Sequence, residues 1–333
     1  MRWVRYRDAG DPETRPRLGA VVGDLIHAST QDVSLLGLLG DGHLATYGSR
    51  LLSSPDEVVA ITDVSLAAPI ESPPSIRDFM AFEQHVEGMG RLAGTTPSVP
   101  DVWYRQPLFY FSNPACLHGP DDDVAMPPGG EVFDFELEVA AIVGLAPGIT
   151  RLSDLTVEES ARCISGYVLM NDWTARDLQF AEMQGPLGPC KGKDFAISLG
   201  PWLLTADELP GLATGESADI ALTASIDGVV FGGDSPASMA WTFAELVSYA
   251  SRGTRLRVGD VFGSGTCGNG CLAERWGREG RDSMAPLRPD AVVTLDAGPL
   301  GRQTSRVRPA GPVRNPLRDR RSPAGSDEAG DGS

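Results

Sequence analysis

Residues 133–143 read Phe-Asp-Phe-Glu-Leu-Glu-Val-Ala-Ala-Ile-Val, and this stretch constrains the fold more strongly than the rest of the chain. Its apolar residues are typical of a buried strand, in which successive side chains point to opposite faces. Glu136 and Glu138 should therefore point to the same side. At roughly 6–7 Å spacing beside an apolar core, two carboxylates repel each other and lose hydration, so they need a cation or strongly perturbed pKa values. A hard divalent metal ion with oxygen ligands would meet this need.

The composition is that of a globular chain and argues against several kinds of partner. With 333 residues, 41% of them hydrophobic and 22% charged, we expect one large domain with a small appendage, or two domains. No run approaches the ~20 apolar residues of a membrane-spanning helix, and the first residues lack the apolar core of a secretory signal. The net charge of −17 argues against nucleic acid or an anionic membrane as a partner.

The cysteines indicate a reducing compartment. There are five of them, an odd number, scattered along the chain, which fits free thiols in a cytoplasmic protein better than a disulfide framework. Cys267 and Cys271 could form a soft-metal pair, but no Cys or His stands near them in the sequence, so we disfavour this interpretation.

The pattern along the chain predicts three parts. Residues 1–70 form a small β-rich unit that ends in a proline-rich stretch, residues 71–308 form a strand-rich domain, and residues 309–333 form a disordered tail with few apolar residues. We expect an α+β, predominantly β fold. The predicted strands are 3–7, 18–26, 64–67, 108–111, 137–143, 164–170, 202–205, 220–226 and 292–295, with helices at 33–39, 157–163 and 243–250, an Asp-Gly hairpin at 225–230, and a mobile loop or lid at 86–102.

Two polar positions next to apolar runs are candidates for chemistry, each with a plainer alternative. Asp172 follows the predicted strand 164–170, and by its local sequence alone a helix cap is the favoured interpretation over a ligand. His85 lies a few residues after Asp78, and is either a surface histidine at the end of a short helix or a general base, since imidazole titrates near neutral pH.

Two glycine-rich turns carry further candidates. Lys193 lies in the turn at residues 185–195, which lacks the spacing of a phosphate-binding loop; it is either an exposed lysine or a cation that offsets surplus carboxylate charge. Thr266 lies in the turn at residues 263–270, and Glu274, which follows it, could orient a histidine.

Four motifs, taken together and in this order, resemble the fumarylacetoacetate hydrolase superfamily over about residues 75–307. They are Asp-Phe-x-x-x-x-Gln-His at 78–85, Asp-x-Glu-x-Glu at 134–138, Asn-Asp-Trp-x-Ala-Arg-Asp-x-Gln at 171–179 and Gly-Lys-x-Phe at 192–195. The resemblance implies a mixed β-roll or β-sandwich catalytic domain behind a small N-terminal domain, and a homodimer.

The resemblance also implies a set of site residues. One divalent cation, Mg²⁺ by preference with Mn²⁺ or Ca²⁺ as alternatives, would be bound by Asp78, Glu136, Glu138 and Asp172. The implied catalytic residues are His85 as the base, Glu274 as the group that orients it, Lys193 and Gln179, and the implied substrate contacts are Tyr110, Arg176 and Thr266.

A small dicarbonyl acid could chelate such a metal through two oxygens, so that the cation stabilises a developing enolate. The expected reaction is hydrolysis of a carbon–carbon bond; isomerisation of a related 2-hydroxy-dienoate or decarboxylation of an oxo acid would use the same intermediate. A non-catalytic protein that binds metal and ligand is the alternative of another class. Three departures from the family pattern bear on the substrate: Met80 replaces a frequent tyrosine, Arg91 is the nearest match to a substrate-binding arginine, and Gly88 replaces a lid glutamate.

Overall fold

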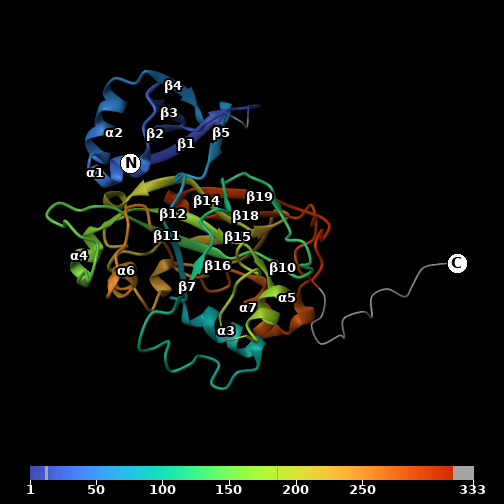
Figure 1. Ribbon diagram of the computed structural model, residues 1–333. Coiled ribbons are helices and arrows are strands. Elements are labelled where there is room, and N and C mark those ends of the chain that lie inside the picture. Colours follow the sequence, from blue (N-terminus) through green and yellow to red (C-terminus); the bar gives the residue numbers. More distant parts are fainter. Residues whose placement is uncertain (12–13, 186, 318–333) are drawn as a thin grey trace.

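A central mixed sheet organises the chain in the computed structural model, which describes residues 1–11, 14–185 and 187–317 (Figure 1). Its strands follow the order β4-β3-β2-β1-β14-β12-β11-β17-β6-β7, and β5 pairs with β1 while β8 pairs with β14. The bounds are β1 Arg2–Asp8, β2 Arg17–Val22, β3 Leu25–Ala28, β4 Glu57–Ala60, β5 Val64–Ala67, β6 Ile76–Phe79, β7 Phe109–Ser112, β8 Leu117–His118, β11 Leu137–Val143, β12 Ile164–Asp172, β14 Ile197–Thr205 and β17 Val261–Gly263.

A second sheet and seven helices complete the described part of the chain. The second sheet has the order β16-β15-β18-β19-β9, and β10 pairs with β13 alone. These strands are β9 Val124–Ala125, β10 Phe133–Asp134, β13 Thr174–Ala175, β15 Leu222–Ile226, β16 Val229–Asp234, β18 Val292–Asp296 and β19 Arg302–Arg308. The helices are α1 Leu35–Asp41, α2 Leu44–Ser53, α3 Glu83–Ala93, α4 Val157–Arg162, α5 Arg176–Glu182, α6 Phe243–Ser251 and α7 Leu272–Glu279. The predicted α+β, predominantly β class is confirmed.

Strand β11 lies between β12 and β17 and is buried on both faces, as the opening stretch of sequence predicted. Its odd-numbered residues, such as Val139, pack into the core shared with the second sheet and α6. The even-numbered Ala140 and Ile142 pack into the core shared with the N-terminal helices. Glu138 belongs to this even-numbered face. A charged side chain there is enclosed by protein, so its environment must be built by other strands.

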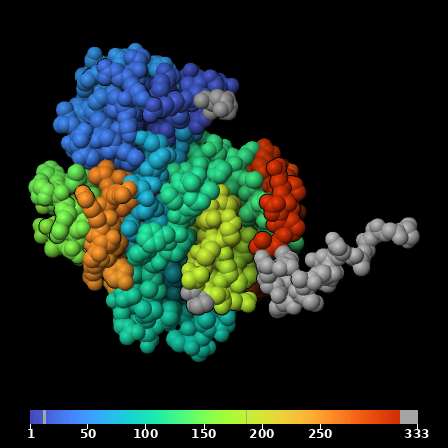
Figure 2. Space-filling model, in the orientation of Figure 1, coloured from blue at the N-terminus to red at the C-terminus, as the bar shows by residue number. Residues whose placement is uncertain are grey.

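The N-terminal residues add their strands to the same central sheet. Strand β1 runs antiparallel to β14, with Arg2 opposite Leu204 and Trp3 opposite Leu203. In the space-filling view, residues of this part (blue) form a lobe at one end of the molecule (Figure 2). The division into units at 1–70 and 71–308 stays a prediction. Residues 309–317 have no helix or strand, and the rest of the predicted tail, residues 318–333, lies outside the described residues.

Several predicted elements match and others need correction. The Asp-Gly hairpin is confirmed, with positive φ at Asp227 (51°) and Gly228 (78°) between β15 and β16. The single strand predicted at 18–26 is two strands, β2 and β3, because Gly23 turns the chain with φ 58°. Helix α2 and strand β4 escaped prediction. Within the described residues, no helix is both long and apolar enough to cross a membrane.

The prediction of a loop at residues 86–102 is wrong for its first half, because helix α3 occupies residues 83–93. Helix α3 packs closely against α7, and glycines make this approach possible. A Cβ on Gly277 would lie 1.9 Å from the Gly88 carbonyl oxygen, and a Cβ on Gly88 would lie 2.5 Å from Glu274 Cγ. Tertiary packing therefore outweighs the low helix propensity of Gly88 and Gly90. The same contact explains why a larger residue is excluded at position 88.

This packing predicts opposite effects for two helical glycine substitutions. Gly88→Ala should lower the free energy of unfolding by about 1–3 kcal/mol, because the new methyl group forces α3 away from α7. Gly37→Ala in α1 is the matched control, since its Cβ would meet nothing closer than Ser34 Cβ at 3.9 Å. Alanine is the better helix former, so Gly37→Ala should raise stability by up to about 1 kcal/mol. Urea unfolding measures both; equal effects of the two substitutions would contradict the packing argument.

Candidate active site

Four carboxylates converge at one end of the central strands. They come from β6 (Asp78), the residue before β11 (Glu136), β11 itself (Glu138) and the last residue of β12 (Asp172). Each offers an oxygen, and these oxygens all lie within 4.8 Å of one another. We call these four residues the carboxylate cluster. All four side chains are buried, with at most 3% of the residue exposed. The strand pairing brings together residues that are up to 94 positions apart in the sequence.

Two buried cations lie against the cluster and neutralise part of its charge. Lys193 Nζ donates to Glu136 Oε2 and Asp172 Oδ2. Arg176 donates through one guanidinium nitrogen to Glu136 Oε1 at 2.7 Å and through another to Asp134 Oδ2 at 2.8 Å. Five carboxylates thus face two cationic side chains, so negative charge remains in surplus. Arg176 and Lys193 thus both hold carboxylates of the cluster in place.

Several oxygens of the cluster have no donor to bind. Asp78 Oδ1, Asp172 Oδ1 and both carboxylate oxygens of Glu138 are buried and accept no hydrogen bond from the described residues. Gly263 leaves the space for this crowding, because a Cβ there would lie 2.4 Å from Asp78 Oδ1 and 3.0 Å from Glu138 Oε2. An all-oxygen set of buried, unpartnered carboxylates fits a hard divalent cation such as Mg²⁺, Mn²⁺ or Ca²⁺.

The cluster has one side where cations neutralise a carboxylate and another side where carboxylates repel each other. Burial, and then the charge of a neighbouring carboxylate, raises the pKa of Asp78 to about 7. Burial and the neighbouring carboxylates also raise the pKa of Glu138 well above its ordinary value. Burial acts in the same direction on Glu136, but Lys193 and Arg176 outweigh it and lower its pKa to about 2. Asp78 and Glu138 therefore form the side that most needs a cation.

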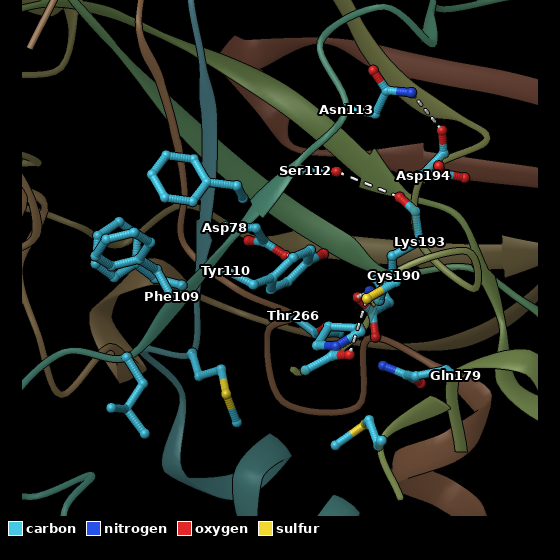
Figure 3. A pocket seen from close by; sticks show the side chains of 18 of the residues that line it. Asp78, Phe109, Tyr110, Ser112, Asn113, Gln179, Cys190, Lys193, Asp194 and Thr266 are labelled. Carbon is cyan, nitrogen blue, oxygen red and sulfur yellow. Dashed lines mark hydrogen bonds and ion pairs between the residues drawn. The ribbon is translucent and has the colours of Figure 1, made fainter. Parts of the chain in front are cut away.

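Tyr110 was predicted as a substrate contact, and the structure places it against the cluster. Its hydroxyl donates to Asp78 Oδ2 at 3.0 Å and also to Asp172 Oδ2. Burial, and then the charges of Asp172 and Asp78, raises its pKa well above the ordinary value, so it stays a donor. Tyr110 thus orients the oxygens of two carboxylates. Its ring lies beside Asp78 and Lys193 at the centre of the cavity (Figure 3).

His85 lies on α3 and lines a cavity that Asp78 and Glu136 of the cluster also line. Its Nδ1 is 3.8 Å from Glu274 Oε2 and 3.7 Å from Cys271 Sγ. Glu274 is itself fixed by the Asn269 backbone N–H at 2.9 Å and by Arg278 at 2.9 Å. Burial would raise the pKa of Glu274, but its interaction with His85 lowers it, so it faces the imidazole as an anion. This geometry allows Glu274 to orient His85.

A cavity of about 930 Å³ opens over these groups. Gln179 and Thr266, both predicted site residues, line it together with His85 and Lys193. Gln179 Oε1 accepts a hydrogen bond from Arg176 at 3.0 Å. In Figure 3, Phe109 lies on the opposite side of the cavity from Gln179, with Tyr110 between them. A single space therefore touches carboxylates, an imidazole, an amide and a hydroxyl.

Three of the plainer alternatives are wrong. Asp172 caps no helix, since it ends β12 inside the core and the next helix, α5, has Ala175 as its N-cap. His85 is not a surface residue, because only 7% of it is exposed. Lys193 is not an exposed turn lysine, because it is 4% exposed and paired on two sides. In each case the local sequence could not indicate the partners that other strands bring.

Two residues of the site escaped prediction. Asp134 accepts hydrogen bonds from the Leu272 and Ala273 backbone N–H groups at 2.9 and 3.0 Å, so it ties the first turn of α7 to Arg176. The Asp-x-Glu-x-Glu motif contains it and was the available signal. Cys271 lies beside His85 in the fold, although 186 residues separate the two in the sequence. That separation left no local signal.

Comparison with known proteins identifies the family. A family model described as the fumarylacetoacetate (FAA) hydrolase C-terminal region matches residues 75–308. The chain therefore belongs to the fumarylacetoacetate hydrolase family, and the resemblance of the four motifs is confirmed. The fumarylacetoacetase of Arabidopsis thaliana is 31% identical over 242 residues, which are 59% of this chain and 57% of the plant protein. The chain thus spans less than two thirds of that relative.

Solved structures share the fold. A maleylpyruvate hydrolase from Sphingobium sp. SYK-6, in complex with manganese(II) ion and pyruvate, superposes with a TM-score of 0.67 at 20% identity, covering 93% of this chain and 100% of that one. A 5-carboxymethyl-2-hydroxymuconate delta-isomerase from Mycobacterium smegmatis gives a TM-score of 0.64 at 19% identity, with 93% and 100% coverage. At these identities the likeness concerns the fold, which is therefore shared by proteins named for different reactions.

The carboxylate oxygens without a hydrogen-bond donor predict how substitution of one candidate metal-binding residue changes the stability of the protein. Glu138→Gln should raise the melting temperature of the metal-free protein, because it removes a buried carboxyl group that its neighbours repel when it is charged and that must otherwise take up a proton. The same variant should lose most of the stabilisation by Mg²⁺ or Mn²⁺, which for the wild type at 100 times the dissociation constant is about 2.7 kcal/mol. Glu158→Gln, on the exposed face of α4, is the matched control and should change neither quantity. A wild type that no divalent cation stabilises would refute the metal site.

The raised pKa values predict that stabilisation of the protein by a divalent cation depends on pH. Protonated Asp78 is favoured in the metal-free fold, so that form loses stability as pH rises through the Asp78 pKa of about 7. Metal binding requires the carboxylates to be deprotonated. The increase in melting temperature caused by Mg²⁺ should therefore be larger at pH 8 than at pH 5.5, as measured by differential scanning fluorimetry. An increase that is the same at both pH values would mean that protons do not compete for the site.

Proposed function

We propose that this protein is a metal-dependent enzyme that hydrolyses a carbon–carbon bond in a small dicarbonyl acid of the acylpyruvate or fumarylacetoacetate type. The observation that carries the proposal is that His85 lines the same cavity as Asp78 and Glu136, two members of the carboxylate cluster. A divalent cation held by Asp78, Glu136, Glu138 and Asp172 would supply positive charge that stabilises an enolate. The family membership supports the same reaction class.

His85 is assigned the role of general base. Its Nδ1 faces the Glu274 carboxylate, which stabilises the imidazolium that forms when the ring takes a proton. In a hydrolase the proton comes from water, whose oxygen adds to the carbonyl carbon remote from the acid end. The bond from that carbon to the neighbouring CH2 group then breaks, which leaves one carboxylic acid and the enolate of the acid end, and the proton held by His85 returns to the enolate carbon. Glu274 cannot turn away during this step, because Asn269 and Arg278 hold its oxygens.

Lys193, Gln179 and Thr266 are assigned to the substrate oxygens. Burial would lower the pKa of Lys193, but the charges of Asp172 and Glu136 outweigh it and raise the pKa, so the amine stays cationic and does not act as a base. The Gln179 amide and Thr266 hydroxyl are neutral donors on the cavity wall. Arg176 is different from the prediction of a substrate contact, since its nitrogens bind Asp134, Glu136 and Gln179. We assign it to positioning those groups.

Isomerisation of a 2-hydroxy-dienoate is the second candidate, because a base that moves a proton between carbon atoms would need the same groups. The fold likeness to the Mycobacterium smegmatis isomerase favours keeping it. Product identification separates the candidates: hydrolysis gives two acids, isomerisation conserves the mass, and decarboxylation of an oxo acid releases carbon dioxide. Binding of metal and oxo acid with no turnover at all would indicate the non-catalytic alternative.

Substitution of the base tests the catalytic proposal. His85→Ala should lower kcat for acylpyruvate hydrolysis by about 10²–10⁴-fold, while the shift in melting temperature caused by Mg²⁺ persists. His43→Ala is the matched control, because His43 is exposed in the N-terminal part and should leave kcat unchanged. Release of pyruvate, followed with a coupled assay, gives the rates. Unchanged kcat in His85→Ala would show that His85 is not the base.

A further inference from the structure

The active-site cavity adjoins a second, apolar cavity of about 580 Å³. Four side chains line both cavities and mark where they meet: Met80, Met89, Leu108 and Met183. No member of the carboxylate cluster lines the second cavity. The combined space therefore has a polar end at the cluster and an apolar end beyond these four residues, which we call the apolar gate residues.

The apolar end is part of the fold and not a surface irregularity. Trp103 and Val86 line it and belong to a small buried core, against which Met80 and Leu108 pack. The Trp103 indole N–H donates to the Met80 carbonyl oxygen at 2.5 Å, which fixes the chain where it leaves β6. Met89 lies four residues after His85 on α3, so both side chains face the cavity from one side of the helix.

The charges on the walls indicate which ligands this end accepts. Arg176, Lys191 and Lys193 line the first cavity, and each is paired with a carboxylate of this chain. In the described wall of the second cavity, Arg281 is the only charged side chain, and it lies over the Phe180 ring at 5.5 Å. Arg91 is not on either wall and pairs with Glu87. A carboxylate buried among the apolar residues of this cavity would lose water, and the cation on its wall, Arg281, is exposed to solvent.

We propose that the second cavity binds an uncharged, apolar substituent of the substrate, an alkyl or aryl group on the carbonyl remote from the acid end. This inference rests on the proposed function, since the acid and dicarbonyl end must lie at the carboxylate cluster. A molecule as small as pyruvate would leave most of the 930 Å³ cavity unfilled. Methionine side chains are flexible and polarisable, so the gate can adapt to chains of different shape.

The test uses straight-chain 2-oxo acids as probes, because they carry the acid end without a bond to cleave. Isothermal titration calorimetry in Mg²⁺ compares 2-oxobutanoate, 2-oxohexanoate and 2-oxooctanoate. The dissociation constant should fall about fourfold for each added methylene, which is ~0.8 kcal/mol converted at 1.4 kcal/mol per tenfold. 2-Oxohexanedioate, which ends in a second carboxylate, should bind more weakly than 2-oxohexanoate. Equal affinity along the series, or tighter binding of the diacid, would overturn the inference.

Substitution of one apolar gate residue tests whether the second cavity causes the dependence of affinity on chain length. Met183 is 51% exposed, so Met183→Lys should fold, and it should flatten the dependence of affinity on chain length. Val22→Lys is the control, because Val22 is similarly exposed (49%) on β2, outside both cavities, and should leave that dependence as in the wild type. If Met183→Lys instead splits a dimer into monomers without changing the dependence, the apolar end is an interface between copies and the inference fails.

The inference and the proposed function fail in different ways. Turnover of acylpyruvates together with a flat binding series overturns the apolar-substituent inference alone. A steep binding series together with no turnover of any acylpyruvate upholds the inference and overturns the hydrolase proposal.

Discussion

The structure depends on one electrostatic constraint, which is the burial of four carboxylates within 4.8 Å of one another. Such a group is unstable unless its charge is balanced, because burial removes water and the charges repel. Lys193 and Arg176 balance the side at Glu136, and the side at Asp78 and Glu138 is left for a cation. These contacts join the central sheet to the turn that carries Lys193 and to the start of α5.

The same constraint links the site to the helices that cover it. Asp134 binds Arg176 on one side and the first turn of α7 on the other, so the charge balance of the cluster also positions α7. Helix α7 carries Glu274, and close packing at Gly88 and Gly277 holds α3, with His85, against it. The base is therefore placed by a chain of contacts that begins at the carboxylates. Met89 extends the same helix face to the apolar end of the cavity.

The sequence allowed prediction of those parts in which local pattern and function agree. The apolar run at residues 137–143 predicted β11, and three of the four motifs contain the carboxylates that the structure brings together. Prediction from the local sequence failed where the structure or role of a residue depends on a partner that is distant in the sequence. The local sequence around Asp172 favours a helix cap, because it does not show that other strands bring Asp78 and Glu138 beside it. Gly88 and Gly90 favour a loop, because the sequence does not show that Gly88 packs against α7 and Gly90 against the Ser98 backbone. Tyr110 carried no local sign that it would bind two carboxylates.

Among the described residues, two groups of side chains close to the cavity could bind a metal ion, and we expect a metal ion at only one of them. The carboxylate cluster has hard oxygen donors, whereas His85, Cys271 and Glu274 form a mixed group that we assign to orienting the base. Anomalous diffraction at the manganese edge from a crystal soaked in Mn²⁺ distinguishes them directly. We expect one peak within coordination distance of Asp78, Glu136, Glu138 and Asp172. A peak at the His85 group, or none at the cluster, would contradict it.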